Sequence, residues 1–169
     1  AKFRATDGAE FWRHGEGLQQ QCDSARDVRF DAAGDVIATG IIQPAFATIK
    51  FSGVSGARLW RHDVVIGTTP VNGPYPIIGH WEEPTAGRHV RALPNGNALI
   101  SGSGAGLTSG LNELIVAELD TNTGEEVWIH RSHHVDSCGD ADWGGSGLTI
   151  SQTGRVVVAD KYRAQVDGS

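Results

Sequence analysis

The stretch from His130 to Trp143, HRSHHVDSCGDADW, holds the densest group of side chains that could do chemistry in this 169-residue chain. Imidazole and thiolate groups suit zinc, and carboxylates suit calcium. The spacing matches neither site, because a calcium loop needs a third carboxylate, a placed glycine and a distal glutamate. We interpret the stretch as a solvated loop that packs on the blades, with a metal site, such as calcium, or a ligand- or partner-binding site as the alternative. Its candidate residues are His133, His134, Asp136, Asp140, Asp142 and Trp143.

A second candidate binding element is the long connection from Val64 to Ala86, which holds four of the six prolines. Connections of this length inside a compact domain usually serve binding or packing. Its aromatic and acidic residues are the other candidates for partner binding, namely Trp81, Glu82 and Glu83.

Sequence signatures of catalysis are missing from this chain. It contains neither Gly-x-Ser-x-Gly nor His-Glu-x-x-His. The glycine-rich segment Ser103–Leu111 lacks the lysine of a phosphate-binding loop. We therefore expect no catalytic residues.

Composition and charge limit the kinds of partner. The chain is 39% hydrophobic and 20% charged, as an ordinary globular domain is. A net charge of −6 with scattered basic residues argues against nucleic acid. No apolar run approaches the roughly 20 residues that span a bilayer, so we expect no membrane insertion. The 23 glycines favour strands joined by tight turns over helices.

Three stretches share one pattern of strand, glycine-bearing turn, and a second strand with a tryptophan followed two residues later by a histidine. We call them Trp hairpins. They run over Lys2–His14, Ile49–His62 and Leu114–His130, with tryptophans at Trp12, Trp60 and Trp128. The fixed place of these tryptophans predicts packing between repeats, with each indole N–H bonded to a neighbouring backbone group.

A second hairpin type, which we call the plain hairpin, alternates with the first. Its copies are Val28–Gly40, Val90–Gly102 and Leu148–Ala159, each with a turn ending in glycine. One plain and one Trp hairpin together make a unit of four strands. For the first complete unit we expect strands at 27–30, 35–40, 46–51 and 58–63.

Four antiparallel strands repeated in this way are typical of a β-propeller blade. The segment AELDTNTGEEVW (117–128) resembles the tryptophan-docking motif of pyrroloquinoline-quinone-type propeller repeats. The stretch 31–60 is similar to the bacterial β-propeller repeat family. The resemblance implies an all-β propeller, or part of one, in a periplasmic or secreted protein.

The repeats divide the chain into a half blade at 1–14, blades at 25–63 and 87–131, and a half blade at 146–161. That makes about three blade equivalents, whereas closed rings usually take about 4 to 8. We therefore expect either a piece of a longer propeller, which the lack of methionine favours, or several chains that complete a ring. Cys22 and Cys138 occupy equivalent places two blades apart, too far for a disulfide within a ring. We expect them to be free thiols or to pair with another chain.

Two functions are consistent with this pattern. The first is a non-catalytic scaffold that holds a protein or glycan partner through its loops, without a cofactor. The alternative is a fragment of a pyrroloquinoline-quinone-type dehydrogenase, although the adjacent cysteines of such an active site are missing. Fold resemblance alone does not decide between them, because one fold serves many functions.

Overall fold

The computed structural model describes residues 1–16, 23–42, 45–65, 86–105, 112–133, 147–151 and 153–159. Within these ranges every regular element is a β-strand. The two complete units form four-stranded antiparallel sheets, and the two end hairpins form two-stranded sheets. The predicted all-β class is thus confirmed, and none of the described sheets closes on itself.

The first complete unit forms a sheet with strand order β3-β4-β5-β6. The strands are β3 (Ser24–Phe30), β4 (Val36–Ile42), β5 (Ala45–Phe51) and β6 (Arg58–Val64). They match the four expected strands, and every observed end lies within three residues of the expected one. Each strand pairs with the next one in the chain, because turns of a few residues allow only antiparallel neighbours.

The second unit repeats this order as β7-β8-β9-β10. Its strands are β7 (Ala86–Ala92), β8 (Ala98–Ala105), β9 (Asn112–Leu119) and β10 (Glu126–His133). The end hairpins are β1 (Lys2–Phe3) with β2 (Glu10–Trp12), and β11 (Gly147–Ile150) with β12 (Val156–Ala159). β10 continues three residues beyond its expected end, so that His130 to His133 belong to a strand.

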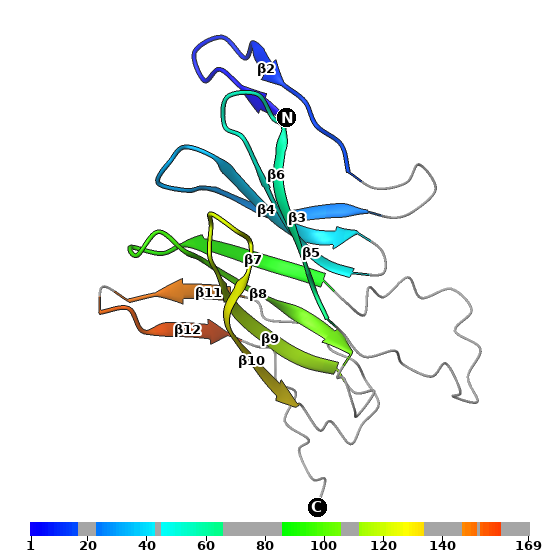
Figure 1. Cartoon of the computed structure of the whole chain (residues 1–169), viewed down its shortest axis with the longest axis vertical. Coiled ribbons are helices and arrows are strands. Elements are labelled where there is room, and N and C mark those ends of the chain that lie inside the picture. Colours follow the sequence, from blue (N-terminus) through cyan, green and yellow to red (C-terminus); the bar gives the residue numbers. More distant parts are fainter. Residues whose placement is uncertain are drawn as a thin grey trace, which may run out of the picture.

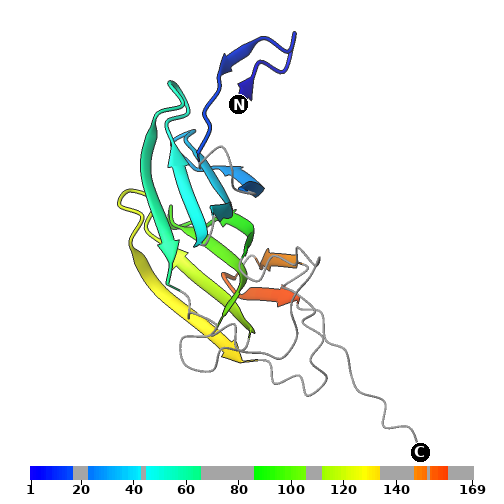
Figure 2. The same cartoon turned by 90° about the vertical axis from the view of Figure 1, so that its right-hand side faces the viewer.

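The sheets lie one after another in chain order (Figure 1, Figure 2). β1–β2 lies at one end, sheet β3–β6 follows, sheet β7–β10 comes next, and β11–β12 lies against β7. We call the face of a sheet that looks toward the preceding sheet its front face, and the opposite face its rear face. Strand alternation assigns each side chain to one of the two faces.

The main core lies between the rear face of β3–β6 and the front face of β7–β10. Both faces contribute fully buried aliphatic and aromatic side chains, which exclude water from the space between the sheets. They are Ile37, Phe46 and Val64 on the first sheet, and Val90, Ala98, Ile100, Ile115, Ala117 and Leu119 on the second. A smaller core of Leu99, Val116 and Leu148 joins the rear face of β7–β10 to β11–β12.

Within each hairpin type, all three copies have the same turn. In Trp hairpins the glycine N–H donates to the carbonyl four residues back, as Gly56 does to Ser52. In plain hairpins it donates three residues back, as Gly34 does to Asp31. All six glycines have positive φ, between 72° and 92°, a region that L-residues with a side chain rarely occupy. The two repeat types inferred from the sequence are thus real structural repeats.

Asp27 on β3 fastens the two four-stranded sheets together at their first strands. Its Oδ2 accepts hydrogen bonds from Val90 N at 3.1 Å and from Arg91 Nη1 at 2.7 Å. Burial by itself would raise the pKa of Asp27, but the hydrogen bonds from Val90, Arg91 and Val28, and the charge of Arg29, hold it below its ordinary value.

Replacement of this carboxylate, Asp27→Asn, is expected to lower the free energy of unfolding by about 1–3 kcal/mol at neutral pH. A carboxyl with a lowered folded pKa stabilises fully above its unfolded pKa, and this contribution is lost as the pH falls through the folded pKa. The difference in the free energy of unfolding between wild type and Asp27→Asn should therefore become smaller when the urea titrations are done at pH 3 rather than at pH 7. A difference that stays constant over that range would show that the charge is not what stabilises the contact.

Candidate binding surface between stacked sheets

Contacts between successive sheets centre on the Trp hairpins. The Trp60 indole lies over the turn of the following Trp hairpin, where a Cβ on Gly124 would come within 2.8 Å of its ring. Trp60 Nε1 donates to Thr121 O at 2.9 Å. Trp12 repeats the arrangement one unit earlier, over Gly56, with its N–H donated to Gly53 O at 3.3 Å. For Trp12 and Trp60 the predicted packing and backbone bond are confirmed.

Trp128 does not follow the prediction. Its indole N–H donates to Glu118 Oε2 of its own sheet at 2.7 Å rather than to a backbone group of a following turn. The side chain is more open than those of Trp12 and Trp60, with 39% of the residue exposed. The reason is that no described turn of the Trp type follows β10. Trp128 thus stands at an uncovered surface.

The position paired with each tryptophan adds a second contact between sheets. Lys2 pairs with Trp12, and Lys50 with Trp60. Lys2 Nζ donates to Gly53 O at 2.7 Å and Lys50 Nζ to Thr121 O at 3.0 Å, the same carbonyls that the tryptophans use. Glu118 occupies this position beside Trp128 and accepts hydrogen bonds from Asn95 and Asn97 instead. Those bonds hold the pKa of Glu118 below its ordinary value, although burial would raise it.

Lys50 is more buried than Lys2, its counterpart in the first Trp hairpin. Its ammonium lies 2.7 Å from Asp31 Oδ2 and 3.2 Å from Asp35 Oδ2, and 7% of its side chain is exposed. Burial would lower the pKa of Lys50, but the two carboxylates raise it above its ordinary value. Asp35 also accepts a hydrogen bond from the Gly53 N–H. The side chains of Lys50, Asp31 and Asp35 therefore connect two turns of sheet β3–β6 with the Thr121 turn of sheet β7–β10.

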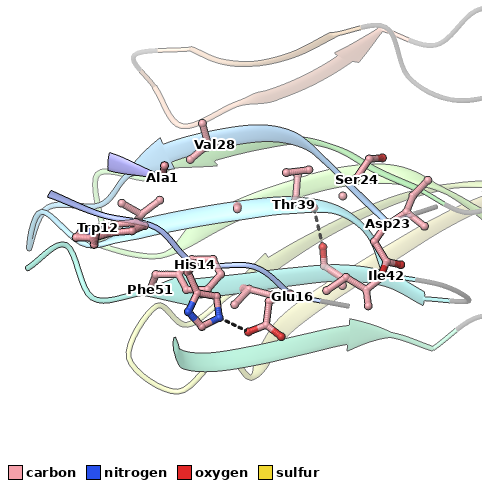
Figure 3. A pocket seen from close by; sticks show the side chains of 17 residues that line it. Ala1, Trp12, His14, Glu16, Asp23, Ser24, Val28, Thr39, Ile42 and Phe51 are labelled. Atoms are coloured by element: carbon pink, nitrogen blue, oxygen red, sulfur yellow. Dashed lines mark hydrogen bonds and ion pairs between the residues drawn. The ribbon is translucent and has the colours of Figure 1, made fainter. Parts of the chain in front are cut away.

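A cavity of about 320 Å³ lies between β1–β2 with the residues after it and the front face of β3–β6. Its floor is apolar and its rim is polar, with His14 Nε2 2.9 Å from Glu16 Oε1 (Figure 3). The His14 ring lies 4.9 Å from that of Phe51, and Glu16 forms an ion pair with Arg58 at 3.1 Å. The histidine is already bonded to a carboxylate and packed on an aromatic ring. Because its floor is apolar, this cavity is suited to binding an apolar group.

The floor of the cavity consists of the front-face side chains of three strands. Figure 3 places Trp12 and Phe51 at one end of it and Ser24, Asp23 and Ile42 at the other. The apolar floor residues are Val28, Val36, Ala38, Ile42, Ala47, Ile49 and Phe51.

Most of the candidate residues inferred from the sequence lie outside the described part of the chain. These are Trp81, Glu82, Glu83, His134, Asp136, Asp140, Asp142 and Trp143, and Cys22 and Cys138 as well. His133 is described only by its backbone, at the end of β10 opposite Glu113. The partner-binding and calcium hypotheses for these residues remain predictions. Among the described residues, no group of three or more His, Cys, Asp or Glu side chains is placed to hold a metal ion.

Sequence reasoning missed the charged contacts between sheets. Asp27 and Lys50 each bond a sheet other than their own, and His62 Nε2 lies 3.1 Å from Glu126 Oε1 across the same junction. One signal was available: aligning the Trp hairpins puts Lys2, Lys50 and Glu118 in one column. A lysine conserved between two repeats and replaced by an acid in the third marks a contact that differs at the third repeat.

Comparisons with known proteins give no match: no family model, no curated protein and no solved structure is similar to this chain. The resemblance to quinone-type propeller repeats therefore depends on the motif residues alone. Within the described ranges, no helix has the length and hydropathy needed to cross a membrane.

Proposed function

We propose that this protein is a non-catalytic scaffold of the β-propeller type that binds a protein partner. The observation that carries the proposal is the repeated docking of Trp12 and Trp60 on the turn of the following sheet. Repeated units that bury their faces only against neighbours behave as scaffolds, with stability spread over the stack and recognition left to exposed edges and loops. A periplasmic or secreted location belongs to the same proposal.

A protein partner fits the uncovered surfaces better than a glycan does. The described residues expose apolar side chains on strands, among them Phe3 (53%), Phe30 (58%) and Val157 (57%). Apolar side chains and unpaired strand edges are complementary to another polypeptide, which supplies both apolar contacts and main-chain hydrogen bonds.

The test of this function is a titration of the 169-residue chain with pyrroloquinoline quinone and calcium, followed by near-ultraviolet and visible absorption and by reduction of an electron-accepting dye in the presence of alcohols and sugars. We expect spectra that are the sum of the separate components, and no dye reduction. Saturable binding of the quinone with substrate-dependent dye reduction would contradict the scaffold proposal and establish the dehydrogenase alternative.

A further inference from the structure

Within the described part of the chain, each of two sheet faces has a hairpin over one half only, and the two hairpins differ in type. On the rear face of β7–β10, β11–β12 covers the inner strands, with Leu148 packed on Leu99 of β8 and Val116 of β9. The outer strand β10 keeps Trp128 (39%) and His130 exposed on that face. The half that remains open is the half that a Trp hairpin covers at the other two junctions.

The front face of β3–β6 shows the opposite arrangement. β1–β2 covers its outer part, where Trp12 lies over the Gly56 turn. The inner part, around Val36, Ala38 and Ile49, has no described hairpin over it and is the floor of the cavity shown in Figure 3. Val36 (8%) and Ile49 (5%) have little exposure, because the residues that follow β2 lie over the cavity. The equivalent positions on β7–β10, Ala98, Ile100 and Ala117, are completely buried by the sheet before them. Among the described residues, the front face of β3–β6 therefore lacks a plain hairpin, and the rear face of β7–β10 lacks a Trp hairpin.

The end hairpins have matching unpaired edges. In the repeat, β12 corresponds to β4 and β1 to β5, and β4 pairs with β5 so that Val36 lies opposite Phe51 and Ile37 opposite Lys50. The same register would place Val156 opposite Phe3 and Val157 opposite Lys2. Phe3 is 53% and Val157 57% exposed, and among the described residues β1 pairs only with β2 and β12 only with β11. Unpaired apolar edges of this kind readily accept another strand.

We propose that a second copy of this chain completes both faces, so that β1–β2 of one copy pairs along β12 of the other and forms a four-stranded sheet shared by two chains. This inference names the partner of the proposed scaffold and rests on that function. Two such contacts, related by a twofold axis, close the ring.

Residue types across the new junction reproduce the junction already present inside the chain. There, His62 of one sheet meets Glu126 of the next at 3.1 Å. His130 occupies the position of His62, and Glu10 of the second copy occupies that of Glu126, each two residues from its tryptophan. An imidazole thus faces a carboxylate at both junctions, which is electrostatically complementary.

The turn that would receive Trp128 is also preformed. The Arg4–Gly8 turn has the hydrogen bonds of the two occupied turns, and Gly8 has φ +72°. A Cβ on Gly8 would meet nothing within 4 Å, whereas on Gly56 or Gly124 it would meet a tryptophan ring. On docking, the Trp128 N–H exchanges its bond to Glu118 for the carbonyl of Ala5, the counterpart of Gly53 and Thr121.

The first experiment is sedimentation equilibrium of the 169-residue chain. We expect a mass twice the monomer's 17.9 kDa. Val157→Lys places a charge on the β12 edge, a common means by which proteins block strand pairing, and should weaken the dimer at least about tenfold. The matched control is Val54→Lys, because Val54 is 91% exposed in a turn that takes no part in the contact. Circular dichroism should be unchanged in both variants, since neither valine is buried.

A cross-link separates a second copy from closure of one chain on itself. Phe3→Cys and Val156→Cys are combined in a Cys22→Ser, Cys138→Ser background, because directly opposed strand positions suit a disulfide. We expect oxidation to give a covalent dimer on a non-reducing gel, and Phe3→Cys with Val54→Cys to give none.

Two results would contradict the proposal that a second copy completes these faces. One is a folded chain that stays monomeric at high concentration, and the other is a bridge formed within single chains. Both leave the scaffold function standing, whereas quinone binding with dye reduction removes that function whatever the mass.

Discussion

Phe46→Ala is expected to lower the free energy of unfolding by about 4 kcal/mol, the largest effect we foresee for a single side chain. Phe46 is completely buried between the two four-stranded sheets. A Cβ on Gly102 would come within 2.7 Å of its ring, so the glycine leaves room for the aromatic side chain to fill the space between sheets. Removing the ring leaves a cavity that these stacked sheets cannot close without moving apart.

Urea unfolding followed by tryptophan fluorescence measures this loss. Phe11→Ala is the matched control, because the same atoms are removed from a residue that is 53% exposed, and its effect should stay within about 0.5 kcal/mol. A loss below about 1 kcal/mol for Phe46→Ala would mean that the two sheets do not share a packed core.

Lys50→Met is expected to lower the free energy of unfolding by about 3 kcal/mol, which is the second large effect. The substitution keeps the apolar stem but removes the ammonium, which leaves two carboxylates of Asp31 and Asp35 facing each other and the Thr121 carbonyl without that donor. Removing one member of a buried charged cluster is costly because the remaining charges stay desolvated. The Asp31 side chain is only 4% exposed, so water cannot replace the lysine there.

Lys2→Met is the matched control for Lys50→Met. Lys2 occupies the same repeat position and donates to the corresponding carbonyl of Gly53. Lys2→Met should lower the free energy of unfolding by about 1 kcal/mol, the net contribution of an ordinary hydrogen bond. Adding Asp31→Asn to Lys50→Met should restore part of the lost stability, since one of the uncompensated charges is removed. Equal losses for Lys50→Met and Lys2→Met would argue against a buried charged cluster.

Short apolar, β-branched stretches and glycine turns were sufficient to predict the strands and their order. In Leu114–Leu119 consecutive residues such as Ile115 and Val116 are buried on opposite faces, and the turn glycines fix where such strands end. Such information is local, because it depends on which residues neighbour each other in the chain. The sequence therefore predicted both hairpin types and their alternation correctly.

The contacts between sheets could not be predicted in this way. Asp27 and Val90, or Lys50 and Thr121, are more than 60 residues apart, and their meeting depends on how far each sheet is rotated against the next. Trp128 shows the limit most clearly. Its hairpin has the turn and tryptophan of the Trp60 hairpin, and Glu118 replaces the lysine. Its hydrogen bond goes to that glutamate, because what a docked tryptophan contacts is decided by the neighbouring sheet.

The forward docking of Trp12 and Trp60 makes the stack directional. Trp12 and Trp60 always reach toward the C-terminal neighbour, so the two ends of the stack carry different chemical groups: a vacant turn at Gly8 and an uncovered indole at Trp128. Each contact through these ends is head to tail, and a dimer closes only where a twofold axis relates two such contacts. A head-to-tail contact that fails to close adds subunits without limit, so the angle between sheets decides between a finite ring and a filament.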